Sequence, residues 1–371
     1  MTTKTSFTAA QAARLRIQCQ SLVGDGHASI HAAAVHMLAM QGQDFAAVQW
    51  ALGARVPGST QQDVVDAFSS GKLVRGWPMR GTLYALPADV LPWFLELTTE
   101  RVLRGVQRRW DVLDIDEPWL ERVRDQTLKF MQGGTRATRK EFTDSLVDAG
   151  FDMVGSRGYH AIWYLSQTGT LVWGPMSESG EHQLVLSEEW MPKARKFDRD
   201  AVLGELLRRF VHARGPATLK DFAWWTGLTQ GDAKAGLTAA GDSLVEVTVD
   251  GASMWMSAEA VDTYDPSARG VGTSVLTLTG FDEHILGYQS RDIQLPREHA
   301  NLIVPGNNGV FRPTIVSGGI TLGTWKRIKR AKRIDISYEL FDTWAPTQRK
   351  HFGAAIQRYA DFLGTDAQIV D

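Results

Sequence analysis

The sequence contains a single cysteine, Cys19, among its 371 residues. One cysteine excludes an intramolecular disulfide and a cysteine-based zinc cluster, and no histidine partner stands nearby in the sequence, so we expect a buried structural thiol. Long hydrophobic runs are also missing. No window approaches the length that spans a bilayer, and the N-terminus lacks the apolar stretch of a signal peptide. We therefore expect a folded cytoplasmic protein without membrane contact.

An excess of charge of either sign is absent as well. The 40 basic residues are balanced by 42 acidic ones, for a net charge of −2. This balance argues against nonspecific coating of a polyanion by the whole molecule, but it leaves room for a local basic face. No metal-ligand spacing, phosphate-binding loop or dinucleotide fingerprint occurs. We therefore expect no metal and no cofactor.

Two segments of the chain resemble each other. GTRATRKEFTDSLVDAG (134–150) is matched by RGPATLKDFAWWTGLTQG (214–231), and each copy has a threonine three residues before an acidic residue. This spacing is typical of a capping box at a helix start, although aspartate in place of glutamate weakens the second copy. An amphipathic segment precedes each copy, and a further helix and two short strands follow. Three helices and a hairpin are the layout of a winged helix, found here twice.

The rest of the chain extends this pattern. We expect N-terminal helices over 8–23, 28–40, 44–55 and 61–71, then two strands within 72–87, as a third copy. Strands are expected over 273–288, 300–327 and 333–341, before a closing helix at 347–364. Linkers are expected at 176–183 and 262–270. The predicted fold class is α+β, with tandem winged-helix domains at 1–87, 88–190 and 191–265 and a small C-terminal β-barrel at 266–371.

Basic residues gather in TWKRIKRAKR (324–333), where cations alternate with apolar residues. Such a strand suits a groove that follows phosphates, so Lys326, Arg327, Lys329 and Arg330 are candidate DNA contacts. The alternative is a solvated edge strand protected by its charges. Among the 13 tryptophans, most are explained by core packing. Trp77 lies in a candidate wing, and its ring either stacks on a base or packs beneath the hairpin.

Four segments carry a specific resemblance: HMLAMQGQDFAAVQWALGARV (36–56), GWPMRGTLYALP (76–87), GFDEHILGYQSR (280–291) and NNGVFRPTIVSGGITLGTWKR (307–327). Their order and spacing resemble those of the AlkZ-like (YcaQ-type) DNA glycosylases, which consist of tandem winged helices closed by a β-barrel. Gln41 and Gln43 match the family's catalytic Gln-x-Gln motif. Two residues depart from the family pattern: Gly42 stands at a usually apolar position, and Tyr84 where a histidine is expected.

The resemblance implies a monofunctional DNA glycosylase that removes N7-alkylated, cationic purines from duplex DNA and that unhooks interstrand crosslinks. It implies a monomer without a cofactor. The expected DNA-binding residues are Arg75, Trp77, Arg80, Arg312, Lys326, Arg327, Lys329 and Arg330. The alternatives are a non-catalytic DNA-binding protein, such as a transcriptional regulator, and a scaffold whose winged helices bind protein.

The residues of the motif also have a purely structural interpretation. Gln41 and Gln43 would then cap the end of a helix and bond loop backbone. Asp44 is the nearest carboxylate and a possible auxiliary base, but aspartate commonly caps a following helix, and we expect that role here. By resemblance, Asp282 and Glu283 are placed in a barrel strand with a structural role, beside His284 as a satisfied strand residue.

Overall fold

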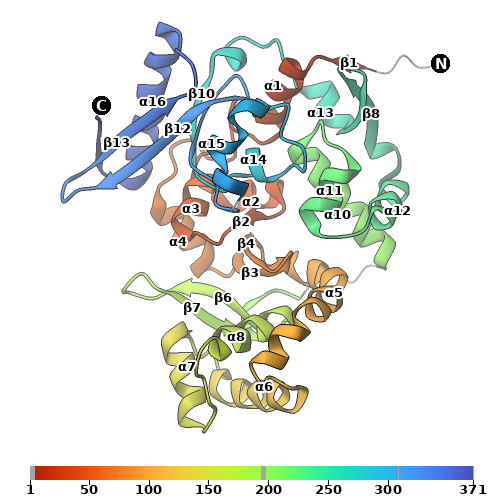
Figure 1. Ribbon diagram of the computed structural model, residues 1–371, viewed down its shortest axis with the longest axis vertical. Helices are drawn as coiled ribbons and strands as arrows, with labels where there is room; N and C mark the ends of the chain where they lie inside the picture. Colours follow the sequence, from red (N-terminus) through yellow and green to blue (C-terminus); the bar gives the residue numbers. More distant parts are fainter. Residues whose placement is uncertain (1–4, 194–197, 308, 371) are drawn as a thin grey trace. The chain divides into compact units, whose positions relative to one another are not determined.

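The computed structural model describes residues 5–193, 198–307 and 309–370. The chain combines groups of helices with sheets whose neighbouring strands are mostly antiparallel, so the expected α+β class is confirmed (Figure 1). Contacts divide the chain into a larger unit, residues 1–64 and 198–371, and a smaller unit, residues 65–197. The expected domain boundary at 190 lies near the end of the smaller unit, whereas those at 87 and 265 fall inside the units. Within the described ranges, every helix is too short or too polar to span a bilayer.

The larger unit begins with helices that start at polar capping residues. The side chains of Thr8, Ser29 and Asp44 each accept a hydrogen bond from a backbone amide of the first turn. These amides have no partner within the helix, so the caps define where each helix begins. The helices are α1 (Ala9–Cys19), α2 (Ile30–Met37), α3 (Phe45–Gly53) and α4 (Gln61–Ser69), of which α4 crosses into the smaller unit. All four expected N-terminal helices are confirmed.

The larger unit continues with the second copy of the repeated segment. Its elements are α10 (Arg199–Arg214), α11 (Leu219–Thr226), α12 (Gln230–Ala240), η1 (Gly241–Ser243), β8 (Leu244–Val249), β9 (Ala252–Ser257) and α13 (Ala258–Thr263). The capping box is complete despite its aspartate, because Thr218 N donates to Asp221 Oδ2 at 2.8 Å and Asp221 N donates to Thr218 Oγ1 at 3.0 Å. Asp250 and Gly251 turn the hairpin with φ of 46° and 81°. Strand β1 (Ser6–Phe7) adds to it in parallel with β8.

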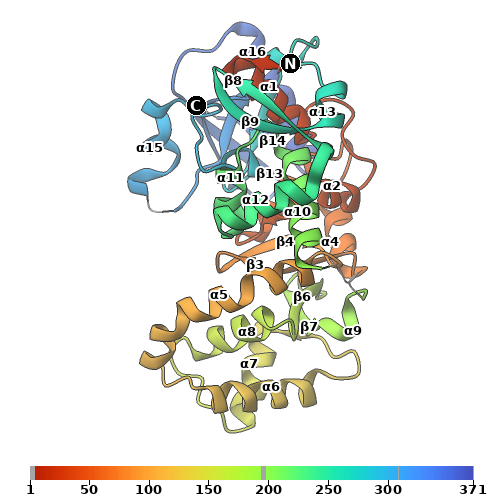
Figure 2. The ribbon, with the colours of Figure 1, turned by 90° about the vertical axis from the view of Figure 1, so that its right-hand side faces the viewer.

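The smaller unit contains the first copy. Its helices are α5 (Leu91–Val112), α6 (Glu117–Met131), α7 (Arg139–Asp148), α8 (Arg157–Gln167) and α9 (Ser187–Trp190). Helices α6, α7 and α8 pack together beside α5 (Figure 2). Its strands lie side by side in the order β4 (Thr82–Pro87), β3 (Leu73–Met79), β6 (Leu171–Met176), β7 (His182–Leu186) and β5 (Ala137–Thr138). The segment 176–183, expected as a linker, is instead the tip of the β6–β7 hairpin, where glycine and serine serve the turn.

The C-terminal part of the larger unit is a curled sheet. Its strands follow the order β10 (Val275–Leu278), β11 (Thr314–Ser317), β12 (Ile320–Lys329), β13 (Arg333–Leu340) and β14 (Asp366–Ile369), and α16 (Pro346–Leu363) packs on it (Figure 1). In the described residues β10 and β14 are the two edges, so the sheet is an open half-barrel. Gly318 and Gly319 form the expected hairpin turn. Short helices fill the remaining connections: η2 (Val271–Thr273), α14 (Glu283–Leu286), η3 (Arg297–His299), α15 (Ala300–Ile303) and η4 (Pro305–Asn307).

Two expected strand segments are wrong in part. Within 300–327 only β11 and β12 are strands, because residues 300–303 form α15 and residues 305–307 form η4. Of residues 273–288, only Val275–Leu278 form a strand, and Asp282 caps the single turn α14. Asp282, Glu283 and His284 are 1%, 0% and 0% exposed. Successive side chains of a strand point to opposite faces, whereas each of these three consecutive polar residues must reach a partner inside the unit. A turn of helix preceded by Phe281 at φ 68° allows this.

Three buried or half-buried histidines stay in the neutral form near neutrality. Burial lowers the pKa of His36 and of His182 to about 3, and that of His284 to about 4. Cys19 is also buried, as expected, and burial raises the pKa of its thiol to about 12. The thiol is therefore protonated and unreactive near neutrality.

These histidines predict acid-sensitive stability. In the unfolded chain a histidine takes up a proton near pH 6.5, whereas in the folded chain His36 stays neutral down to about pH 3. The unfolded state therefore binds more protons below pH 6.5, and the free energy of unfolding should fall as the pH drops. We expect a slope of at least about 1 kcal/mol per pH unit between pH 6 and 4.5. Urea unfolding across this range measures it, and His36→Gln should flatten the slope.

Candidate active site

Gln41 and Gln43 lie in the connection between α2 and α3, past the end of a helix as the sequence predicted. Gln41 is 7% exposed, whereas the Gln43 side chain is exposed. The backbone amide of Gln43 donates to Gln41 Oε1 at 3.2 Å. The side chain of the first glutamine therefore holds the backbone of the second, and the two residues form one structural element.

A strained turn leads into this element. Leu38 has φ 66° and ψ −54°, and the amide of Ala39 donates to the carbonyl of Met37 at 2.8 Å. This is a γ-turn of the rarer kind, which a leucine side chain disfavours. Such a conformation persists only where the surroundings hold it, and it stores on the order of 1–3 kcal/mol. The turn ends α2 and directs the chain towards Gln41.

An arginine holds both sides of the turn. Arg214, the last residue of α10, donates from Nη1 to the carbonyl of Met37 and from Nη2 to that of Ala39, each at 2.9 Å. Its guanidinium also lies 4.4 Å from the ring centroid of Trp225. Arg214 is fully buried. The strained turn is therefore fixed to α10 by two charge-assisted hydrogen bonds.

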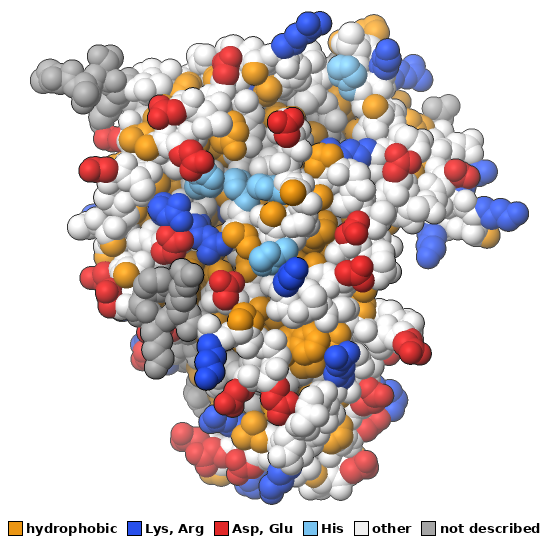
Figure 3. Space-filling view, turned by 180° about the vertical axis from the view of Figure 1, so that it is seen from behind, with side chains coloured by type: hydrophobic (Ala, Val, Ile, Leu, Met, Phe, Trp, Pro, Cys, Tyr) orange, Lys and Arg blue, Asp and Glu red, His pale blue; other side chains and the backbone are white. Residues whose placement is uncertain are grey.

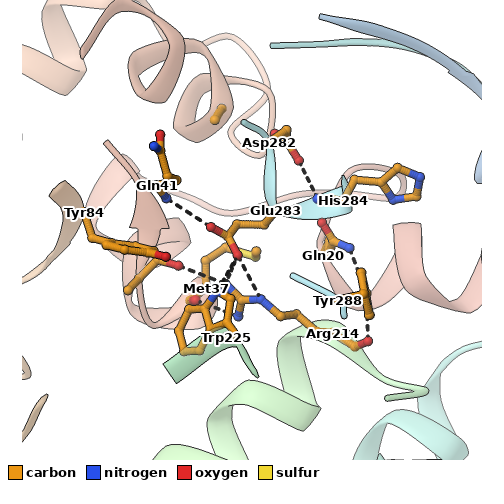
Figure 4. Close-up of polar contacts among 12 residues, drawn as sticks. Gln20, Met37, Gln41, Tyr84, Arg214, Trp225, Asp282, Glu283, His284 and Tyr288 are labelled. Atoms are coloured by element: carbon orange, nitrogen blue, oxygen red, sulfur yellow. Dashed lines mark hydrogen bonds and ion pairs between the residues drawn. The ribbon is translucent and has the colours of Figure 1, made fainter. Parts of the chain in front are cut away.

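Glu283 completes this arrangement (Figure 4). Its Oε1 accepts the backbone amide of Gln41 at 3.0 Å. Its Oε2 accepts Nη2 of Arg214 and Nε1 of Trp225, both at 2.8 Å, and also Nε of Arg214 at 3.2 Å. Both carboxylate oxygens are thus occupied by N–H donors, and the negative charge is paired with a buried cation. Glu283 is a structural acceptor here rather than a free base.

A second group of buried polar residues is connected to Arg214 by hydrogen bonds. Arg55 pairs with Asp282 through two contacts of 3.0 and 3.1 Å and donates to Gln20 Oε1 at 3.0 Å. Burial by itself would raise the pKa of Asp282, but the Arg55 guanidinium holds it below its ordinary value. Gln20 donates to the hydroxyl of Tyr288, which in turn donates to the carbonyl of Arg214 at 2.8 Å. The two buried ion pairs are therefore connected through one chain of hydrogen bonds.

Sequence reasoning missed the roles of Arg214 and Trp225. The sequence does contain one indication of the role of Arg214. This residue follows Phe210 by four residues and Val211 by three, so all three share the apolar face of α10. A charged residue on such a face indicates a buried cation with a partner. Asp44, in contrast, has its expected role, because Oδ1 accepts the amide of Ala47 at 3.1 Å as the cap of α3.

Lys326, Arg327 and Lys329 lie on β12, which forms a projecting hairpin with β13, and Arg330 directly follows β12. Lys and Arg side chains gather on this hairpin in the space-filling view (Figure 3). Lys326, Arg327, Lys329 and Arg330 are exposed. Arg327 contacts the Tyr359 hydroxyl, and Arg330 donates to Asp335 at 2.7 Å. The hairpin therefore presents cations to solvent, and two of its arginines are already oriented by partners.

The remaining expected DNA contacts differ in exposure. Arg75, Arg80 and Arg312 are half-buried. Arg80 donates to the hydroxyl of Tyr84, which is 1% exposed. Trp77 is 3% exposed and belongs to the core of the smaller unit, beside the ring of Tyr159. Of the two interpretations of Trp77, packing beneath the hairpin is the one in the structure, because a ring this buried has no free face for a base.

Three comparisons with known proteins each find similarity to DNA glycosylases. The family model described as DNA glycosylase AlkZ-like matches residues 34–362. A Streptomyces sahachiroi protein named interstrand DNA cross-link repair glycosylase is 25% identical over 280 residues, which are 72% of this chain and 73% of that protein. The solved structure of Streptomyces sahachiroi DNA glycosylase AlkZ aligns with a TM-score of 0.81 at 19% identity. That alignment covers 98% of this chain and 100% of the other, and it shows a shared fold.

Proposed function

Because the chain belongs to the AlkZ-like family of DNA glycosylases, we propose that it hydrolyses the N-glycosidic bond of N7-alkylated, cationic purines in duplex DNA and unhooks interstrand crosslinks. The Streptomyces sahachiroi relative is named for interstrand cross-link repair, which supports the second part. We assign the reaction to Gln41 and Gln43. The observation that carries this assignment is the exposed Gln43 on a backbone that Gln41 and Glu283 hold in place.

The chemistry of a cationic base explains why two amides suffice. Cleavage passes through a transition state with positive charge on the sugar. A neutral base needs protonation to leave, whereas an N7-alkylated purine already carries the charge and leaves as a neutral molecule. The remaining task is to orient water and the sugar. Amide carbonyls accept from water and amide NH₂ groups donate to the sugar, so the glutamines act by positioning.

The carboxylates that contact this segment are already engaged. Glu283 accepts four N–H bonds, and Asp44 caps α3. Neither is arranged as a general acid for a neutral leaving group. We therefore propose that the enzyme selects its substrates by the charge of the lesion.

A base-release assay tests this function. The protein is incubated with duplexes carrying 7-methylguanine, 3-methyladenine, uracil, hypoxanthine or an N7-linked interstrand crosslink, and free base or unhooked strand is quantified. We expect release of the two cationic bases and unhooking of the crosslink, and no release of uracil or hypoxanthine. Release of the neutral bases at comparable rates would contradict the proposed chemistry.

We further propose that the chain contains three winged-helix modules: α6 to β7, α10 to β9, and the N-terminal helices with β3 and β4. In the first two, three helices are followed by an antiparallel hairpin, as that module requires. The β12–β13 hairpin would add phosphate contacts through Lys326, Arg327, Lys329 and Arg330, with Arg75, Arg80 and Arg312 as further candidates.

Neutralising the hairpin should weaken DNA binding in a salt-dependent way. Lys326→Gln and Lys329→Gln should each lower affinity and reduce the slope of log affinity against log salt by roughly one unit. Fluorescence anisotropy with a labelled duplex at several salt concentrations measures both quantities. Lys350→Gln on α16, where the lysine is also exposed, is the matched control. If the salt slope of the hairpin variants equalled that of the control variant, the hairpin would be a solvated edge strand that does not contact phosphates.

A further inference from the structure

We propose that Glu283, together with Arg214, is a positioning residue for the Gln41–Gln43 segment in base release. This inference rests on the proposed function. Neither side chain is expected to touch DNA, because both are fully buried. They act through the backbone: Glu283 accepts the Gln41 amide, and Arg214 holds the carbonyls of Met37 and Ala39.

The direction of the Gln41 backbone depends on these bonds. The γ-turn at Leu38 is strained and would relax if its two carbonyls were released. Glu283 orients the Arg214 guanidinium that bonds both carbonyls, because its Oε2 accepts from Nε and Nη2. The same carboxylate holds the Gln41 amide. One ion pair therefore fixes the entry to the motif and its first residue together.

Trp225, the third residue bonded to Glu283, connects the motif to the adjacent helices. Trp225 of α11 donates to Glu283 Oε2, and its ring lies against the Arg214 guanidinium. The motif is thus located relative to both α10 and α11, although 242 residues separate Gln41 from Glu283 in sequence. Amides that position water lose effectiveness steeply with displacement, and an error of about 1 Å is enough to lower a rate on the order of 100-fold. The ion pair supplies the required rigidity.

Glu283→Gln is the informative variant because it preserves size. A glutamine keeps one acceptor for the Gln41 amide but presents NH₂ to Arg214 and Trp225, which are themselves donors. We expect single-turnover release of 7-methylguanine to slow by roughly 10- to 100-fold, with unchanged affinity for the duplex. Arg214→Lys is a second variant. It retains the charge next to Glu283 but lacks the planar guanidinium whose three nitrogens bond the two carbonyls and the carboxylate together, and it should show the same pattern.

A matched control separates positioning from general damage to the core. Asp221 is also a buried carboxylate of the larger unit, and it accepts bonds from the Thr218 amide, the Thr218 hydroxyl and the Gln289 amide. None of these donors belongs to the motif segment. Asp221→Asn should lower thermal stability as Glu283→Gln does, yet keep the wild-type rate when both variants are assayed below their unfolding transitions.

A double-mutant cycle decides the question. If Glu283 acts through the two glutamines, the rate loss from Glu283→Gln should be several-fold smaller in a background that carries both Gln41→Ala and Gln43→Ala than in the wild type. Equal losses in both backgrounds would overturn the inference, because Glu283 would then act independently of the glutamines. A wild-type rate for Glu283→Gln, or an equal loss in Asp221→Asn, would overturn it as well. If the wild-type protein releases no cationic base, the proposed function falls and this inference falls with it.

Discussion

Replacing Gln43 with alanine is expected to slow base release by roughly 100-fold while affinity for duplex DNA stays nearly unchanged. The exposed Gln43 side chain is the part of the motif that can reach DNA, and its proposed role lies in the chemical step. Gln41→Ala should act in the same direction and also remove the acceptor that holds the Gln43 amide. Single-turnover release of 7-methylguanine measures the rate, and anisotropy measures the affinity.

Asp44→Asn is the control for this prediction. Asparagine caps a helix about as well as aspartate, so α3 should remain intact. If the glutamines perform the reaction, Asp44→Asn should keep its activity, and the wild-type rate should show no ionisation of a general base near neutrality. A carboxylate base would instead make the rate fall at acidic pH. A loss as large as that of Gln43→Ala, with folding and binding intact, would assign the base to Asp44.

Arg55→Ala should strongly destabilise the larger unit. Arg55 and Asp282 are 0% and 1% exposed, and removing the guanidinium leaves a buried carboxylate without its counter-charge. Breaking such a pair costs about 3–5 kcal/mol. Arg55 also donates to the carbonyl of Ala51 and to Gln20, so their buried acceptors lose partners too. Urea unfolding followed by tryptophan fluorescence measures the loss.

Two further variants test the cause of this loss. Arg55→Met combined with Asp282→Leu removes both charges and should recover much of the stability, because well-packed apolar side chains replace a buried ion pair at little cost. Lys140→Ala breaks an ion pair on the surface of α7 and should leave stability nearly unchanged. If Arg55→Ala were as mild as Lys140→Ala, the Arg55–Asp282 pair would not be structurally important.

Much of the local structure follows from short stretches of sequence. The capping box of Thr138 and Glu141 joins residues three apart, and its bonds form in the structure as the spacing predicts. The turn at Asp250-Gly251, and the position of Gln41 past the end of α2, were likewise predictable from adjacent residues. Caps and turns depend on backbone groups within a few residues, so the sequence alone determines them.

The environment of the glutamines was decided only by the tertiary structure. Glu283 was expected on a strand, but it lies on the short helix α14, where its carboxylate meets Gln41, Arg214 and Trp225. Arg214 meets Met37 across 177 residues of sequence. No local spacing encodes such contacts, because burying a charge is favourable only when its distant partner is already in place. The sequence by itself determined which residues form the motif, and the packing of α10, α11 and α14 determined how that motif is held.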